Sequence, residues 1–183
     1  MENKELLMDE YRTYVQRLAD LADGKEVILN RTTDHAAVIM SVVFAKAERL
    51  VEIVSGRLDD DIWGVDDVRS QAIAFLNRSD DTKIRIIVED NIDLDTNRLV
   101  SSIRAAGLIG RLKIFHATDE LLKTYDYHFI VADGLHYRFQ GERDKFEAII
   151  QFGNVDRGQK LRAVFASLRS NSVELPLPNP IQA

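Results

Sequence analysis

The stretch YDYHFIVADGLHYRFQ, residues 125–140, decides the fold because it predicts two short strands joined at an Asp-Gly turn. Apolar residues recur on both sides of Asp133-Gly134, the pattern of a β-hairpin closed by a tight turn. His128 lies at the start of the first predicted strand. The stretch therefore predicts an antiparallel part of a sheet, with His128 as a candidate catalytic residue.

Strands and helices alternate upstream of this hairpin. Strands are predicted over 49–56, 83–90 and 111–118, and helices over 35–48, 65–77, 95–107 and 119–125. The run 35–48 is apolar on nearly every side, and we expect a helix capped by Thr33 or Asp34 because a better strand follows at once. Such alternation predicts right-handed crossovers and a largely parallel sheet.

A further strand over 146–153 and a helix over 155–170 close the pattern, and the proline-broken segment 175–183 is expected to be a loose tail. The sequence thus predicts an α/β fold, a mixed sheet flanked by helices. We expect the chain to divide into three parts: an N-terminal helix and linker, the α/β domain, and a proline-containing tail, over residues 1–31, 32–172 and 173–183.

The N-terminal helix is predicted over residues 2–22, with a short strand or a linker after it. Its apolar residues recur every three or four positions and form one seam: Leu7, Tyr11, Tyr14, Leu18 and Leu21. Such a seam needs a partner. It can pack on the domain that follows, which we favour, or pair with a second copy of the chain in a homodimer.

The composition excludes several classes of site and bears on the cellular location of the protein. The 183 residues contain no cysteine, which excludes disulfides, thiolate metal sites and cysteine nucleophiles. The first residues lack the basic and then apolar character of a secretory signal, so we expect a cytoplasmic protein. The longest apolar run, 36–45, is shorter than the roughly 20 residues that cross a bilayer, and no membrane insertion is expected.

Charge is distributed unevenly about a net value of -6. Residues 1–97 hold 12 basic and 21 acidic side chains, whereas residues 98–171 hold 12 basic and 8 acidic. The later part can therefore present a positive face to a nucleic-acid backbone or an acidic protein partner, with a solvated mixed surface as the alternative. The candidate binding residues are Arg138, Lys145, Arg157 and Lys160.

The order of elements, the Asp-Gly hairpin and a closing helix with LRAVFASLRSNS together resemble one half of the phospholipase D superfamily over about residues 34–172. In that family the first hairpin strand carries His-x-Lys, with Asp-Gly four residues later and a Gly-Ser pair beyond the second strand. The resemblance implies a histidine that attacks phosphorus, a lysine that binds phosphate oxygens, and two motif copies, often from two subunits, in one site.

This chain departs from the family motif at its essential positions. Laying Asp133-Gly134 on the family's Asp-Gly puts Asp126 in place of the histidine and His128 in place of the lysine. Residues 140–142 read Gln-Gly-Glu, without the serine. Making His128 the nucleophile instead leaves Ile130 at the lysine position, and an isoleucine cannot neutralise phosphate charge. The resemblance therefore implies a degenerate member of the superfamily.

Three hypotheses of function follow. The first is a catalytically inactive domain that binds a protein partner or a nucleic-acid backbone. The second is a divergent homodimeric phosphodiesterase or nuclease that uses His128, with Asp126, Asp133 and His136 as further candidate catalytic residues and Arg138 or Lys145 against the phosphate. The third is a structural or regulatory subunit that associates through the N-terminal helix.

Metal and cofactor sites have weaker support. Glu89-Asp90-Asn91 and His116 end neighbouring strands on one sheet edge, where magnesium or manganese is conceivable, but an acidic loop that caps the helix near Asp95 is preferred. His128 and His136 could face each other across the hairpin as a metal pair. Phosphate-cradling glycine motifs are absent from the sequence. We expect no metal and no cofactor.

Overall fold

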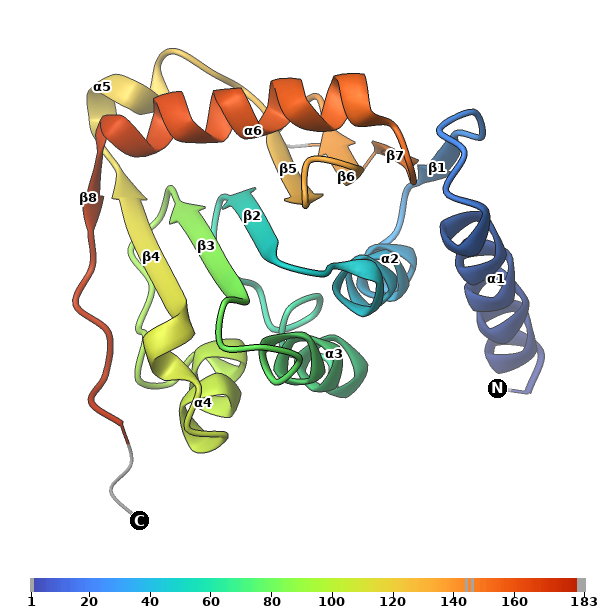
Figure 1. Cartoon of the computed structure of the whole chain (residues 1–183), viewed down its shortest axis with the longest axis horizontal. Coiled ribbons are helices and arrows are strands. Elements are labelled where there is room, and N and C mark those ends of the chain that lie inside the picture. Colours follow the sequence, from blue (N-terminus) through green and yellow to red (C-terminus); the bar gives the residue numbers. More distant parts are fainter. Residues whose placement is uncertain (1, 144, 146, 181–183) are drawn as a thin grey trace.

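The predicted hairpin lies inside an eight-stranded sheet whose strands follow the order β1-β7-β6-β5-β2-β3-β4-β8 (Figure 1). The computed structural model describes residues 2–143, 145 and 147–180. The strands are β1 Ile28–Asn30, β2 Leu50–Ser55, β3 Lys83–Val88, β4 Leu112–Ala117, β5 His128–Ala132, β6 His136–Gln140, β7 Ala148–Gln151 and β8 Ser172–Glu174. The helices are α1 Glu2–Leu21, α2 Thr33–Lys46, α3 Asp66–Leu76, α4 Arg98–Ala105, the 3-10 turn η1 Ile109–Arg111, α5 Asp119–Leu122 and α6 Val155–Ser170.

The sheet has a parallel part and an antiparallel part, as the sequence predicts. Strands β2, β3 and β4 run parallel to one another, while β5, β6, β7 and β1 continue the sheet by antiparallel pairing. Strand β5 joins the two parts because it pairs antiparallel with β2. The mixed α/β fold class with an N-terminal helix is thereby confirmed.

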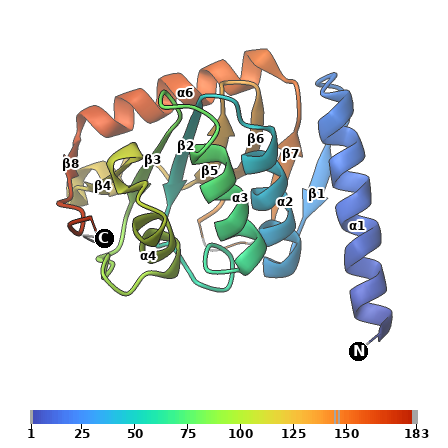
Figure 2. The ribbon, with the colours of Figure 1, turned by 60° about the horizontal axis from the view of Figure 1, so that its bottom comes forward.

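Helices cover both faces of the sheet. Helices α2, α3 and α4 lie on one face and α6 crosses the other, while α1 stands outside α2 (Figures 1 and 2). The larger apolar core forms between the sheet and the helices α1 to α4. A second core joins β5 and β6 to α5 and α6 through Phe129, Val131, Tyr137, Leu161 and Phe165. Burial on both faces explains why the central strands are apolar in nearly every position.

Helix α2 is the most buried helix, and its nine consecutive residues from Ala36 to Phe44 are all buried. Its cap is Thr32, whose hydroxyl accepts a hydrogen bond from the backbone N–H of His35, so the expected cap at Thr33 or Asp34 is wrong by one or two positions. With 14 residues α2 is too short to span a bilayer. None of the helices in the described part of the chain combines the length and the apolar character of a membrane span.

The turn of the hairpin has the geometry that its sequence predicts. Asp133 and Gly134 have φ values of 55° and 68°, the left-handed pair of a type I′ turn. Helix α6 packs closely on this turn, because a Cβ atom at Gly158 would lie 2.3 Å from the carbonyl oxygen of Gly134. Two glycines thus allow α6 to lie directly across the end of the hairpin.

The Asp133 side chain has a structural role. Its carboxylate accepts hydrogen bonds from the backbone N–H groups of Glu48, Arg49 and Leu50, at 2.6, 2.9 and 2.8 Å. Its own N–H donates to the carbonyl oxygen of Leu50 at 2.8 Å. The residue therefore ties the hairpin turn to the chain that enters β2.

The predicted seam of α1 is divided between two sides of the helix. Tyr11 and Leu18 pack toward the core, together with Met8, Val15 and Ala19. The other seam residues, Leu7, Tyr14 and Leu21, remain 57 %, 38 % and 62 % exposed. The prediction of a single seam over all five residues is therefore wrong. Helix α1 packs on the domain through a face that contains only two of the predicted residues, Tyr11 and Leu18.

The C-terminal segment is not a loose tail as far as residue 180. Strand β8 pairs with the edge of β4, and the Leu175 N–H continues this pairing by donating to the Ile114 carbonyl at 2.8 Å. Leu175 and Leu177 pack on the core, and Arg104 donates to the Asn179 carbonyl at 2.7 Å. The expected strand start at residue 146 and the last three residues of the expected tail lie outside the described residues.

Replacing Asp133 by alanine should destabilise the fold by about 2–4 kcal/mol, because three backbone N–H groups lose a charged acceptor. Urea denaturation of the full chain measures this difference. Asp126→Ala is the matched control, since the Asp126 side chain is 76 % exposed. Equal stability of the two variants would contradict the structural role of Asp133.

Candidate functional site

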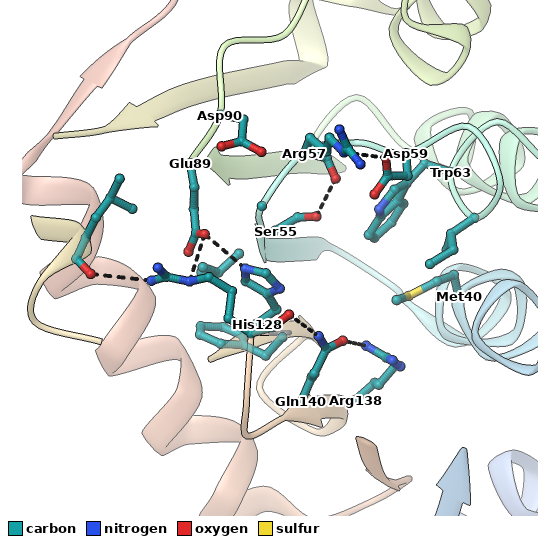
Figure 3. A pocket seen from close by; sticks show the side chains of 16 residues that line it. Met40, Ser55, Arg57, Asp59, Trp63, Glu89, Asp90, His128, Arg138 and Gln140 are labelled. Carbon is teal, nitrogen blue, oxygen red and sulfur yellow. Dashed lines mark hydrogen bonds and ion pairs between the residues drawn. The ribbon is translucent and has the colours of Figure 1, made fainter. Parts of the chain in front are cut away.

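A cavity of about 490 Å³ opens at the edge of the sheet where β2 and β3 end (Figure 3). Parallel strands end on the same edge, and β5, antiparallel to β2, begins there, as β6 ends there. Four strands consequently bring their terminal residues to one place. The charged lining residues are Arg57, Asp59, Glu89, Asp90, Arg138 and Arg143, with His128 among them.

Gly56 allows His128 to approach the end of β2. A Cβ atom at Gly56 would lie 3.3 Å from Cε1 and 3.6 Å from Nε2 of the imidazole. The carbonyl oxygen of Gly56 accepts hydrogen bonds from the N–H groups of Glu89 and Asp90, both at 2.9 Å. The loop after β3 is thereby held against the end of β2, and its first carboxylate is directed into the cavity.

Glu89 is the buried centre of the site, with a side chain only 5 % exposed. Its Oε2 atom lies 3.2 Å from Nε2 of His128 and 3.0 Å from Nε of Arg143 (Figure 3). These are close polar contacts and not directed hydrogen bonds, because Nε2, Nε and Glu89 Oε1 have no hydrogen-bond partner among the described residues. The Tyr125 hydroxyl is equally buried and lies against the same carboxylate, also without a hydrogen bond of good geometry. This cluster retains unused hydrogen-bonding capacity.

The surroundings of Glu89 keep its carboxyl ionised. Burial raises the pKa of the Glu89 carboxyl, but interactions with His128, Tyr125 and Arg143 outweigh burial and hold that pKa below its ordinary value. Burial next to the Glu89 charge in turn raises the pKa of the Tyr125 hydroxyl. At neutral pH the site therefore contains a carboxylate and a neutral phenol side by side.

Arg138 supplies a buried cation from the neighbouring strand. It lies opposite Ile130 in the β5–β6 pairing and is 4 % exposed. Its guanidinium donates to Asn30 Oδ1 at 3.0 Å and to Gln140 Oε1 at 3.2 Å. Burial lowers the pKa of Arg138 to about 10, so the side chain keeps its charge at neutral pH.

The four candidate catalytic residues do not meet. His128 lines the cavity, whereas Asp126 is not a lining residue and lies 3.8 Å from Nε of Arg143, which is one. His128 is paired with Gln140, whereas His136 is paired with Ala132 at the turn end of the hairpin, next to Asp133. The two histidines therefore do not face each other across the hairpin.

His136 is a packed residue. Its Nδ1 accepts a hydrogen bond from the Gly153 N–H at 3.2 Å, and its ring lies against Phe152. Burial lowers the pKa of its imidazole. His136 therefore packs against the connection between β7 and α6, and it is not among the residues that line the cavity.

The four candidate binding residues are dispersed. Arg138 lies in the cavity, and Lys145 lies elsewhere, against Glu142. Arg157 is placed over the ring of Phe139, and Lys160 is exposed on α6. Most other basic residues of the later half pair with carboxylates: Arg98 with Asp66, Arg104 with Asp95, Arg111 with Asp80, Lys113 with Glu174 and Arg162 with Glu52. Of the four candidate binding residues, Arg157 and Lys160 share one element, α6, and the other two lie on β6 and in the loop that follows it.

The acidic loop after β3 has a different role from the one preferred on sequence. Helix α4 is capped by Asn97, whose Oδ1 accepts a hydrogen bond from the Val100 N–H, and Glu89 lies in the cavity instead. His116 lies on β4, paired between Val88 and Val173, and is not a lining residue. In the part of the chain that the structure describes, no three histidine or acidic side chains converge as a metal site requires.

Sequence reasoning missed Arg57 and Arg143 as site residues and undervalued Glu89. The signal for Glu89 was its position at the carboxyl end of a parallel strand, where ligands bind in such sheets. Arg57 also follows a strand of this kind. No comparable signal marks Arg143, which reaches Glu89 only through the path of the loop after β6.

Known proteins match the chain by family model and by fold. The model of a domain of unknown function, DUF7931, matches residues 32–176. No curated protein matches. Among solved structures, TrmBL2, an archaeal chromatin protein whose structure is described as showing a novel mode of DNA binding, is 14 % identical at a TM-score of 0.59. The match covers 95 % of this chain and 65 % of that chain.

Two further matches carry the family resemblance. Nuc from Salmonella typhimurium, a phospholipase D family member, is 9 % identical at a TM-score of 0.58, over 82 % of this chain and 97 % of its own. NucT from Helicobacter pylori is 13 % identical at a TM-score of 0.52, over 82 % and 99 %. At such identities the likeness shows the fold alone, and that fold is phospholipase D-like.

Replacing Glu89 by glutamine should make the free energy of unfolding less dependent on pH. Because the folded-state pKa lies below the unfolded value of about 4.5, the carboxylate stabilises the fold above that pH and ceases to do so as the pH falls through the folded pKa. We expect Glu89→Gln to cost about 1–2 kcal/mol at pH 7. The deficit should shrink below pH 4.5.

Urea denaturation at pH 7, 5 and 4 measures the loss of stability in Glu89→Gln at pH 7 and its decrease at lower pH. Glu142→Gln is the control, since it removes a carboxylate that is 61 % exposed and paired only at the surface. A deficit of Glu89→Gln that stays constant over this range would contradict the ionised state assigned to Glu89.

Proposed function

The chain belongs to the DUF7931 family, a family of domains of unknown function, and we propose that it is a catalytically inactive phospholipase D-like module that binds a phosphate-bearing ligand in the cavity at the end of β2 and β3. The observation that carries the proposal is Arg138. It lies directly across the hairpin from Ile130, the position that lacks a lysine when His128 is aligned with the family's histidine. A phosphate-binding charge is thus present on the adjacent strand.

Loss of catalysis is supported by what surrounds the hairpin. In the alignment through Asp133-Gly134 the place of the nucleophile is taken by Asp126, which points largely to solvent. Neither Asp133 nor His136 approaches His128, because both lie at the turn end of the hairpin. A phosphodiesterase of this family needs a nucleophile, phosphate-binding cations and an acid for the leaving group in one place.

Phosphate binding is supported by the arginines of the cavity. Guanidinium groups match the geometry of phosphate oxygens and remain charged at neutral pH. Arg57 lies at the margin, where its contact with Asp59 at 2.7 Å is solvent-exposed and therefore weak enough to be exchanged for a ligand. A phosphoryl group in this cavity could also accept hydrogen bonds from the donors of the Glu89 cluster, among which the Tyr125 hydroxyl and Nε of Arg143 lack a directed hydrogen bond.

A small ligand agrees better with the surface than a nucleic-acid backbone does. The DNA binding stated for TrmBL2 is a property of that protein. In this chain the basic residues outside the cavity are dispersed and mostly paired with carboxylates. Binding that neutralises many phosphates depends steeply on salt, whereas one or two contacts in a cavity do not.

A divergent phosphodiesterase is the second candidate because of one contact. The carboxylate of Glu89 lies 3.2 Å from Nε2 of His128, and a carboxylate in that position can orient an imidazole whose other nitrogen attacks phosphorus. Arg138 and Arg143 would then neutralise the phosphate. This candidate predicts turnover that depends on His128.

Inorganic phosphate and pyrophosphate should stabilise the full chain against thermal unfolding, and Arg57→Gln should weaken that binding about tenfold through loss of one guanidinium contact. Arg31→Gln is the matched control, because Arg31 forms a similar exposed ion pair with Glu147 outside the cavity. A short single-stranded DNA should bind no more tightly than pyrophosphate. No stabilisation by either phosphate would reject the proposal.

Hydrolysis of bis(p-nitrophenyl) phosphate separates the two candidates. The binding module predicts no release of p-nitrophenol above the buffer rate, for the natural sequence and for His128→Ala alike. Turnover that is present in Arg31→Gln and lost in His128→Ala would replace the binding module by the divergent enzyme.

A further inference from the structure

One side of α1 exposes large apolar residues at a spacing of seven. Leu7, Tyr14 and Leu21 are 57 %, 38 % and 62 % exposed, and they lie one above another, two helical turns apart. Glu10 and Arg17 stand between them on the same side and are exposed as well. The stripe therefore reads Leu, Glu, Tyr, Arg, Leu along the helix.

This stripe is separate from the face by which α1 packs at home. The home face consists of Met8, Tyr11, Val15, Leu18 and Ala19, which contact the core formed with α2. Three of the other exposed large hydrophobic residues, Val27, Leu29 and Ile149, lie in or next to β1 and β7. Leu29 and Ile149 pair with each other and alternate with the core-facing Ile28 and Ile150, so they lie on the opposite face of the sheet from α1 and α2 and do not extend the stripe.

We infer that the stripe on α1 is the contact surface for a second copy of this chain, with the two α1 helices antiparallel about a twofold axis through Tyr14. The order of the stripe is the same apolar-charged-aromatic-charged-apolar sequence from either end, with the two charges opposite in sign. End-for-end pairing places Leu7 beside Leu21 of the second copy and Glu10 beside its Arg17. The twofold axis repeats both contacts, as a self-complementary interface requires.

Charge selects the antiparallel arrangement over the parallel one. In a parallel pair Glu10 would face Glu10 and Arg17 would face Arg17 of the second copy, and like charges at such positions are destabilising. In the antiparallel pair both charged contacts are attractive. Within the stripe, Arg17 already lies against Tyr14, because its guanidinium is 5.7 Å from the centre of the Tyr14 ring.

The proposed dimer contact is separate from the proposed ligand site, because none of the stripe residues lines the cavity. One helix pair buries less than the roughly 1,600 Å² of a standard interface. We therefore expect a dimer that dissociates at about 10–100 µM. Concentration series must cover this range.

Sedimentation equilibrium of the full chain between about 5 and 500 µM tests the inference through charge reversal. Glu10→Arg and Arg17→Glu should each raise the dimer dissociation constant at least tenfold, because each turns two attractive contacts into repulsive ones. The double variant should return to within about threefold of the natural sequence. An equimolar mixture of the two single variants should also re-form a dimer.

Glu26→Arg is the matched control, since Glu26 is exposed, lies outside α1 and undergoes the same change of charge. It should leave the dissociation constant unchanged. A natural sequence that stays monomeric at 500 µM, a dimer that is indifferent to the single reversals, or a double variant that is not restored would each overturn the inference. Circular dichroism confirms that the surface variants remain folded.

Discussion

The three hydrogen bonds that the Asp133 carboxylate accepts from the backbone before β2 are the constraint on which the arrangement of this protein depends. They hold the hairpin in register against β2, the strand at which the parallel part of the sheet meets the antiparallel part. Side chains alternate between the faces of a strand, so a slip of one residue would turn His128 away from the cavity and toward α6. Asp133, at the turn of the hairpin, thus helps to position the site at the other end of the same strand.

The cavity is lined by two buried charged residues, Glu89 and Arg138. Burying Glu89 and Arg138 costs free energy that a purely apolar filling of the same space would not require. The protein nevertheless keeps both groups at the cavity, surrounds the carboxylate with His128, Tyr125 and Arg143, and leaves several of their polar atoms without directed partners. Such an arrangement suits a ligand that supplies the missing contacts better than it suits a structural core.

The N-terminal helix adds a second kind of interaction. One face of α1 holds the helix on α2, and the adjacent stripe with Leu7, Tyr14 and Leu21 remains exposed. The proposed ligand binding and the proposed pairing with a second copy are physically independent, because they use different elements. If both proposals hold, the chain is a module that binds in its cavity and assembles through its N-terminal helix.

Most of the fold could be predicted from the sequence, because helix and strand periodicity, the Asp-Gly turn and glycine at helix ends act over a few residues. The same holds for the absence of His-x-Lys from the hairpin, since residues 126–130 read Asp-Tyr-His-Phe-Ile. The site could be predicted only in part. His128 was recognised, but its contacts with Glu89 and Arg143, the separation of His128 from His136, and the division of the α1 seam depend on strand order, register and packing. Tertiary structure decided these features because they join residues far apart in the chain, whose meeting no local pattern encodes.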